Sequence, residues 1–389
     1  MSDVPHLRFP EFSGEWEETT LGKISEITKG SGISKDQLSE QGSPCILYGE
    51  LYTKYNSEVI GVVYSRTELE SSSLVKSKAN DVIIPCSGET AIDISTARCV
   101  PFNNILLGGD LNIIRLKHDD GGFFAYQLNG ARKKDIARVA QGVSVVHLYG
   151  ENLKHIRVYH PVIEEQKKIT RLLSLIDERI APQNKVIEDL KLLKSAIIER
   201  AYRNRSYHPC RIGDVIEQIS ERYKDKSIDM VLSVSNKHGF INQSEQFEDR
   251  IIASEDTSNY KIVHKNDFAY NPARINVGSV ARLKTIEMGI VSPMYICFRV
   301  RKEVVSEYLE YFFSTSYFFY EMQKRLEGSV RQCLSFESIC NIPIYIPSVE
   351  EQYKIGKNIS ILLDKIDVET NYRSKFEEQK RYLLRQMFI

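Results

Sequence analysis

The side chains of this chain best suited to recognition chemistry are Arg, Asn and Gln in segments that also contain glycine. Arg presents two parallel donors, and Asn or Gln a donor beside an acceptor, which match the edges of guanine and adenine. Asn271, Arg274 and Asn276 stand together in the segment 271–279, which contains Gly278 and follows a short β-prone run. Because glycine permits close approach of the backbone, we expect this segment to form a loop that contacts base edges.

Five other segments share this composition of small, hydroxyl and amide residues: 48–55, 86–90, 141–147, 234–239 and 328–333. The candidate contacts to nucleic acid in them are Tyr52, Thr53, Lys54, Ser87, Thr90, Gln141, Ser144, Ser235, Asn236, Arg331 and Gln332. A structural interpretation competes with the functional one. The first segment also fits a strand edge, 234–239 fits a hairpin turn, and 141–147 and 328–333 fit solvated connecting turns. The sequence leaves both interpretations open.

Basic residues close two aromatic, helix-compatible segments, 123–139 and 308–326. The cations concerned are Lys133, Lys134, Arg138, Lys324 and Arg325. Such side chains suit phosphate groups, which position a protein on a duplex without reading its sequence. The Tyr and Phe residues within 308–320 recur at helical spacing and are predicted to be core.

These segments belong to a unit that occurs twice. The stretch that starts at Gln141 recurs with a constant offset of 186 residues, so that Gly142 corresponds to Gly328. Each copy passes through a β-prone run ended by proline into a Glu-Glu-Gln triplet, at 164–166 and at 350–352. Carboxylates favour the positive end of the helix dipole, so each triplet marks a helix start. The chain is therefore predicted to be duplicated, with one mixed domain and one long helix per half.

Apolar residues in both long segments repeat at alternating steps of four and three, which is a heptad pattern. The predicted helices span about 164–203 and about 349–388. The predicted seam residues are Ile169, Leu173, Ile176, Ile180, Ile187, Leu190, Ile197, Ile355, Ile359, Leu362, Ile366, Phe376, Leu383 and Met387. We expect the two helices to form an antiparallel coiled coil. The alternative is two amphipathic helices, each packed separately on its own domain.

Polar residues interrupt the predicted seam at matching places in the two copies. Gln183 corresponds to Glu369, and Lys194 corresponds to Lys380. Such residues weaken a seam but define the register of the helices. Pro182 lacks a backbone N–H and predicts a kink in the first helix.

Composition places the chain among ordinary globular proteins. Its 389 residues are 42% hydrophobic, enough for two or three cores. The 52 basic residues balance the 52 acidic ones, so a polyanion has to meet local basic patches. Seven cysteines without a CxxC pair favour a reducing compartment and no zinc site. The chain shows neither a signal peptide nor an apolar run of membrane-spanning length, so we expect a cytoplasmic protein without membrane contact.

The expected fold class is α+β, in four consecutive parts. Residues 1–155 form a mixed domain with an arm at 1–20, 156–204 a strand and long helix, 205–341 a second mixed domain, and 342–389 a second strand and helix. Antiparallel helices would relate the domains by a pseudo-two-fold axis. Two half-sites on one face of B-DNA lie about 34 to 36 Å apart. The domains are thus expected to read two half-sites, with the helices as a ruler.

This alternation, the duplicated Gly-x5-Leu-x12-Pro-x2-Glu-Glu-Gln pattern and the LGKISEITKG segment at 21–30 resemble the specificity (S) subunit of type I restriction-modification enzymes. The resemblance covers the whole chain. It implies two target-recognition domains, a bipartite double-stranded DNA target with an unspecified spacer, a role in prokaryotic defence and no catalysis by this chain. It also implies assembly with two adenine-methyltransferase (M) subunits and two motor-nuclease (R) subunits. The sites for S-adenosylmethionine, ATP and Mg are expected in those partners, which would dock on the outer faces of the helices.

Two other functions compete with this interpretation. Asn271-Pro272 begins like the Asn-Pro-Pro-aromatic motif of a stand-alone DNA methyltransferase, but Ala273 and Arg274 follow where that motif needs proline and an aromatic ring. A protein-assembly scaffold with two interaction domains is favoured by the balanced charge and opposed by the paired basic helix ends. The sequence contains no GxxxxGK[ST] loop of a nucleotide-driven motor.

Overall fold

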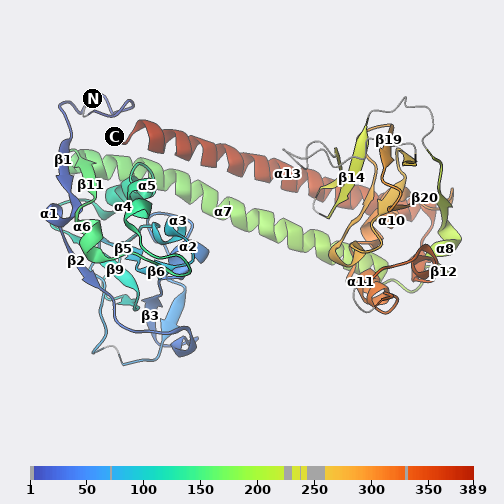
Figure 1. The fold of residues 1–389 in the computed structure, drawn as a ribbon, viewed down its shortest axis with the longest axis horizontal. Helices are drawn as coiled ribbons and strands as arrows, with labels where there is room; N and C mark the ends of the chain where they lie inside the picture. Colours follow the sequence, from blue (N-terminus) through green and yellow to red (C-terminus); the bar gives the residue numbers. More distant parts are fainter. Residues whose placement is uncertain (1–3, 71, 223–229, 237, 243–258, 329–331) are drawn as a thin grey trace. The chain divides into compact units, whose positions relative to one another are not determined.

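The structure is a computed structural model and describes residues 4–70, 72–222, 230–236, 238–242, 259–328 and 332–389. The chain divides into two compact units (Figure 1). Unit 1 comprises Met1–Val186 together with Glu369–Ile389, and unit 2 comprises Ile187–Val368. Each unit therefore contains one mixed domain and a part of each long helix.

Unit 1 is built on a four-stranded antiparallel sheet in the order β2-β9-β5-β7, beside a three-stranded sheet in the order β4-β3-β8. Two short antiparallel ladders, β1-β11 and β6-β10, complete it. The strands are β1 (Glu17–Thr20), β2 (Ser25–Lys29), β3 (Ser43–Ile46), β4 (Ser65–Thr67), β5 (Asp81–Pro85), β6 (Ser87–Gly88), β7 (Arg98–Val100), β8 (Leu106–Leu107), β9 (Leu111–Leu116), β10 (Val146–His147) and β11 (Arg157–His160). The short helices are α1 (Leu21–Ile24), α2 (Glu50–Thr53), α3 (Ala91–Ile94), α4 (Gly121–Asn129), α5 (Lys133–Val139) and α6 (Gly150–Lys154), with a 3-10 turn η1 (Lys35–Gln37).

Unit 2 repeats the central sheet in the order β13-β20-β17-β18 and adds a second four-stranded sheet, β15-β14-β19-β16. The ladder β12-β21 takes the place of β1-β11. The strands are β12 (His208–Arg211), β13 (Ile216–Ile219), β14 (Val231–Ser235), β15 (Gly239–Asn242), β16 (Lys261–His264), β17 (Phe268–Tyr270), β18 (Val280–Arg282), β19 (Met288–Val291), β20 (Ile296–Val300) and β21 (Pro343–Ile346). The short helices are α8 (Ile212–Val215), α10 (Ser306–Phe312), α11 (Ser316–Gln323) and α12 (Phe336–Cys340), with a 3-10 turn η2 (Ile275–Val277).

The same local device starts the central strand of each sheet. Asn80 and Asn266, 186 residues apart, both have positive φ, of 80° and 73°. Asn tolerates this conformation better than most residues. The following carboxylates bind an arginine through two bonds, Arg115 to Asp81 at 2.9 and 2.7 Å and Arg299 to Asp267 at 2.6 and 2.9 Å. The duplication seen in the sequence is therefore also present in the geometry.

The long helices are α7 (Ile163–Tyr202) and α13 (Val349–Gln386), close to the predicted bounds. They run antiparallel (Figure 1), because in unit 1 Asp177 and Gln183 of α7 meet Lys380 and Glu369 of α13. In unit 2, Tyr202 shares a core with Ile355 and Ile359. The predicted helix pair and the α+β class are confirmed. Helix α7 is continuous through Pro182.

The N-terminal arm docks on unit 1. Trp16 is 3% exposed and packs edge-on against Phe123 and Phe388. Arg8 binds Glu165, the second residue of the first Glu-Glu-Gln triplet, through two bonds of 2.7 Å. The amide of Leu7 donates to the carbonyl of Gln386 at 2.8 Å, so the two chain ends meet. Among the described residues, no helix has both the length and the apolar character needed to cross a bilayer.

Candidate nucleic-acid interface

In unit 1 the structure gathers the candidate segments at one place. Strand β6 of the segment 86–90 pairs with β10 of the segment 141–147, and α3 lies against α5. The Tyr52 hydroxyl lies beside Gly88, because a Cβ added to Gly88 would be 3.7 Å from the hydroxyl oxygen. Segments that are far apart in sequence therefore form one surface.

Several candidates in this surface also hold the fold together. Ser87 is buried and donates to Asp110 at 3.1 Å. Thr90 caps α3 by accepting from the amide of Asp93. Lys54 binds Glu50 at 2.6 Å and Ser65 at 3.0 Å, and Thr53 donates to the carbonyl of Gly49. A role for these four in DNA binding stays a prediction, and it would have to coexist with these internal contacts.

The basic helix α5 presents its cations unequally. Lys134 is exposed, whereas Lys133 is half-buried near Thr96 and Arg98. Burial lowers the pKa of Lys133, and the neighbouring Arg98 lowers it further. Arg138 is exposed and pairs with Asp135 at 3.0 Å. Lys134 is thus the cation of this cluster most available to a phosphate.

In both units, backbone hydrogen bonds join the two ends of the segment that starts the repeat, so that it forms a closed loop. Gln141 and His147 exchange backbone hydrogen bonds of 2.9 and 2.7 Å, and Glu327 and Cys333, 186 residues further on, exchange bonds of 2.9 and 2.8 Å. The following glycines have positive φ, 118° at Gly142 and 101° at Gly328. At Gly142 an added Cβ would lie 2.2 Å from the carbonyl oxygen of Val145, so only glycine fits.

The described candidate side chains of these loops remain available. Gln141, Ser144 and Gln332 are exposed. Val143 is 97% exposed, which marks 142–145 as the projecting part of the first loop. Arg331 lies outside the described residues.

In unit 2 the structure also brings candidate segments together. The hydroxyl of Ser279 donates to the carbonyl of Val234, and the amide of Leu334 donates to the carbonyl of Pro272. Asn236 lies beside Gly278, with its Cβ 3.9 Å from where a Cβ of that glycine would be. The segments 234–236, 271–279 and 332–334 are therefore neighbours, although about 100 residues separate the first from the last.

The polar residues of 271–279 differ in availability. Asn271 is buried, and its side-chain oxygen accepts from the amide of Ala273 at 3.0 Å. Asn276 is half-buried, and Arg274 is exposed and has no side-chain hydrogen bond to another described residue. Ser235 is half-buried, with its hydroxyl 3.4 Å from the amide of His238.

Helix α11 lies beside η2 and ends in the second basic cluster. Lys324 and Arg325 both bind Glu321, at 2.9 and 2.6 Å. Burial raises the pKa of Glu321, but the hydrogen bonds from the two cations outweigh it, and the pKa lies below its ordinary value. The ammonium of Lys324 also lies 3.8 Å from the ring centre of Tyr320.

The predicted seam residues are mostly buried. The buried ones are Ile169, Leu173, Ile176, Ile187, Ile355, Ile359, Ile366, Leu383 and Met387. The half-buried ones are Ile180, Leu190, Ile197, Leu362 and Phe376. Both domain cores include seam residues, so the paired helices also pack on the mixed domains.

Sequence reasoning missed a buried ion cluster in unit 1. The ammonium of Lys380 lies 2.5 Å from Glu58 and 2.6 Å from Asp177, and Tyr126 donates to Asp177 at 2.7 Å. Burial lowers the pKa of Lys380, but Glu58 and Asp177 outweigh this effect and raise it. The only sign of this cluster in the sequence was a lysine at a seam position. Its partners Glu58 and Asp177 lie far from it in the chain and could not be predicted. No cluster of three metal-ligating side chains occurs in the described part of the chain.

Comparison with known proteins agrees with this geometry. The chain is 22% identical over 290 residues to the putative type I restriction enzyme MjaX specificity subunit of Methanocaldococcus jannaschii, covering 67% of this chain and 66% of the relative. It is 20% identical over 415 aligned positions to the MjaVIII specificity subunit of the same organism, covering 97% and 92%. It therefore spans just under two thirds of the first relative and most of the second.

Two solved structures share the fold. The S subunit of the type I restriction-modification system of M. genitalium covers 99% of both chains with a TM-score of 0.65 and 16% identity. A chain from a structure on assembly and conformational transition of the type I R-M system covers 95% of this chain and 96% of its own, with a TM-score of 0.52 and 13% identity. The family model of the type I restriction modification DNA specificity domain matches residues 13–192 and 204–378, one stretch for each mixed domain and its long helix. The chain therefore belongs to the family of type I restriction-modification DNA specificity subunits.

Proposed function

We propose that each unit of this chain reads one half of a bipartite DNA target through the loops gathered on its own surface. The supporting observation is the duplicated closed loop, 141–147 and 327–333, which in each unit lies beside the segment that follows the central strand, β5 or β17. Exposed Gln141, Ser144 and Lys134 in unit 1, and Arg274, Asn236 and Gln332 in unit 2, are the side chains most available for contact. Equivalent loops on duplicated domains suit two half-sites.

As a specificity subunit, the chain works in a type I restriction-modification complex with DNA, M subunits and R subunits. Catalysis, and the S-adenosylmethionine, ATP and Mg that it needs, belong to those other subunits. We propose a complex with two M and two R subunits, docked on the outer faces of α7 and α13. We also propose a cytoplasmic location, for which the seven free cysteines are favourable.

The experiment is to purify the chain with its M subunits and to measure binding to random duplex and to duplex from methylation sites mapped in the host genome. We expect a methylated motif in two parts with an unspecified spacer, and tighter binding to duplexes that contain both parts. Equal binding to random and mapped duplex would contradict the proposal. It would favour a scaffold role, in which the two domains bind protein.

A further inference from the structure

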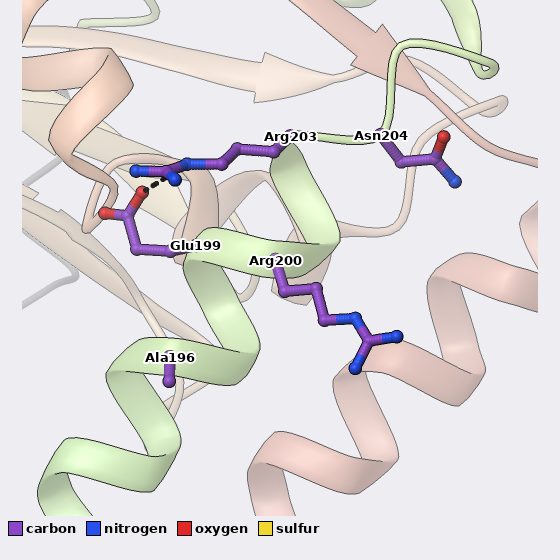
Figure 2. Close-up of a pocket in the computed structure, with 5 residues that line it drawn as sticks. All are labelled: Ala196, Glu199, Arg200, Arg203 and Asn204. Atoms are coloured by element: carbon purple, nitrogen blue, oxygen red, sulfur yellow. Dashed lines mark ion pairs between the residues drawn. The ribbon is translucent and has the colours of Figure 1, made fainter.

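A basic, tyrosine-lined cleft lies at the end of α7 in unit 2, and none of the candidate DNA contacts named above lines it. Its volume is about 450 Å³, and its walls include Arg203, Arg205, Ser316, Tyr317, Tyr320 and Tyr345. A second hollow of about 460 Å³ shares Arg203 with it. Figure 2 shows this second hollow, with Arg203 turned toward Glu199 and Arg200 on the other side of the helix.

The positive charge of the cleft is largely uncompensated. Glu199 uses its two carboxylate oxygens to accept from the amide and the hydroxyl of Ser316, at 2.5 and 2.9 Å, where α11 begins. Arg203 is left with a 3.9 Å contact to the same carboxylate. Arg205 is exposed and has no ion pair or hydrogen bond to another described residue. Two guanidinium groups are therefore available to an anion.

Helix α11 connects the cleft with the proposed DNA surface of unit 2. Helix α11 begins at the cleft with Ser316, carries Tyr317 and Tyr320 along its wall, and lies beside η2 of the loop 271–279. Lys324, next to the end of α11, lies over the ring of Tyr320. Tyr320 and Lys324 thus link the wall of the cleft to the basic cluster at the end of α11.

The corresponding place in unit 1 has different side chains. Phe388 stands where unit 2 has Tyr202, and the carbonyl of Ile389 accepts from Arg132. The guanidinium of Arg132 lies 5.1 Å from the ring centre of Tyr159, the counterpart of Tyr345. Ala131 and Lys134 replace Tyr317 and Tyr320. Two tyrosines of the cleft, Tyr317 and Tyr320, are therefore particular to unit 2.

We propose that this cleft binds the phosphodiester backbone of the DNA held by unit 2, next to the half-site that its loops read. Guanidinium groups match phosphate geometry through two parallel bonds, and tyrosine and serine hydroxyls donate to phosphate oxygens. This inference rests on the proposed function. It adds an anchor beside the half-site that unit 2 reads.

The test uses the complex of the full chain with its M subunits and a duplex that carries the mapped target. The variants are Arg205→Ala and Arg203→Ala/Arg205→Ala. The matched control is Lys302→Ala, which removes one exposed cation from the turn between β20 and α10. Each arginine that contacts a phosphate contributes a slope of about 0.9 to the dependence of log affinity on log salt. We expect the double variant to lower the slope by about two and to weaken target and random duplex by the same factor, on the order of tenfold.

Three further results separate the possible outcomes. Arg203→Lys/Arg205→Lys should keep most of the slope, which a structural role of the arginine side chains would not explain. Phosphate ethylation interference should lose signal beside one half-site in the double alanine variant and beside neither in the control.

If the wild-type complex prefers its target but the double variant keeps the full slope, the cleft is not a phosphate site. Weaker capture of the M subunits by such a variant would assign the cleft to protein. A wild-type complex without target preference would instead overturn the proposed function itself.

Discussion

At the scale of single residues, Arg274 is the side chain of 271–279 most available for reading a base. Asn271 is buried against its own backbone, whereas Arg274 is exposed. Its guanidinium matches guanine, so Arg274→Ala should cost about 1 to 3 kcal/mol on the target and relax one base position. Gel shifts with the target and its single-base variants measure this. Equal weakening on target and random duplex would instead make Arg274 a phosphate contact.

The two lysines that begin α5 should respond differently to replacement. Replacing Lys133 and Lys134 together is expected to flatten the salt dependence of binding. Lys134 is exposed and Lys133 is half-buried, with a pKa that burial lowers. We therefore expect Lys134→Ala to account for most of the change in slope. Lys133→Ala should mainly lower the midpoint of thermal unfolding. A slope that neither substitution alters would exclude both as phosphate contacts.

At the scale of elements, the position of α13 on unit 1 depends on the buried cluster around Lys380. Its side chain is 13% exposed, and Glu58 and Asp177 are 10% and 7% exposed. Lys380→Met would leave two buried carboxylates without their cation, which costs about 3 to 5 kcal/mol. The fluorescence of Trp16 during urea unfolding measures this cost, because Trp16 is buried beside Phe388 at the end of α13 in unit 1.

Unit 2 supplies the control for that prediction. Lys194 occupies the position equivalent to Lys380 and has no ion pair or hydrogen bond to another described residue, and Leu363 takes the place of Asp177. Lys194→Met should change the free energy of unfolding by less than about 0.5 kcal/mol, as measured by circular dichroism. Similar losses for both variants would mean that the ion cluster does not stabilise α13.

Because attraction to Glu58 and Asp177 raises the pKa of Lys380, its stabilising effect should persist through neutral pH and disappear only above the ordinary pKa of lysine.

The elements also mark the limit of what the sequence predicts. The 186-residue repeat, the Glu-Glu-Gln helix starts and the heptad spacing were enough to predict both long helices and their pairing. The partners of particular polar groups were not predictable. Lys380 meets Glu58, 322 positions away, and Lys54 is held by Glu50 and Ser65. Periodicity determines which face of a helix is apolar, whereas such contacts depend on how loops of the mixed domain fold back on that face.

At the scale of the whole molecule, the duplication allows DNA reading by unit 1 and by unit 2 to be tested separately. Gly142 and Gly328 open equivalent closed loops with φ of 118° and 101°. A Cβ at Gly142 would meet the carbonyl oxygen of Val145 at 2.2 Å, so any other residue must distort the loop. Each glycine belongs to a different unit. A substitution at one of them should therefore damage the reading of one half-site and leave the other intact.

This independence can be measured with Gly142→Ala and Gly328→Ala complexes and three duplexes, one with both half-sites and two with a single half-site scrambled. Each variant should lose discrimination against scrambling of one half-site and keep it for the other, with the roles exchanged between the variants. Gly61→Ala is the matched control, because an added Cβ there meets nothing within 4 Å. If either glycine variant loses discrimination at both half-sites, the closed loops stabilise the whole assembly rather than read DNA separately. The duplication would then explain how the fold arose, but the two units would not read separate half-sites.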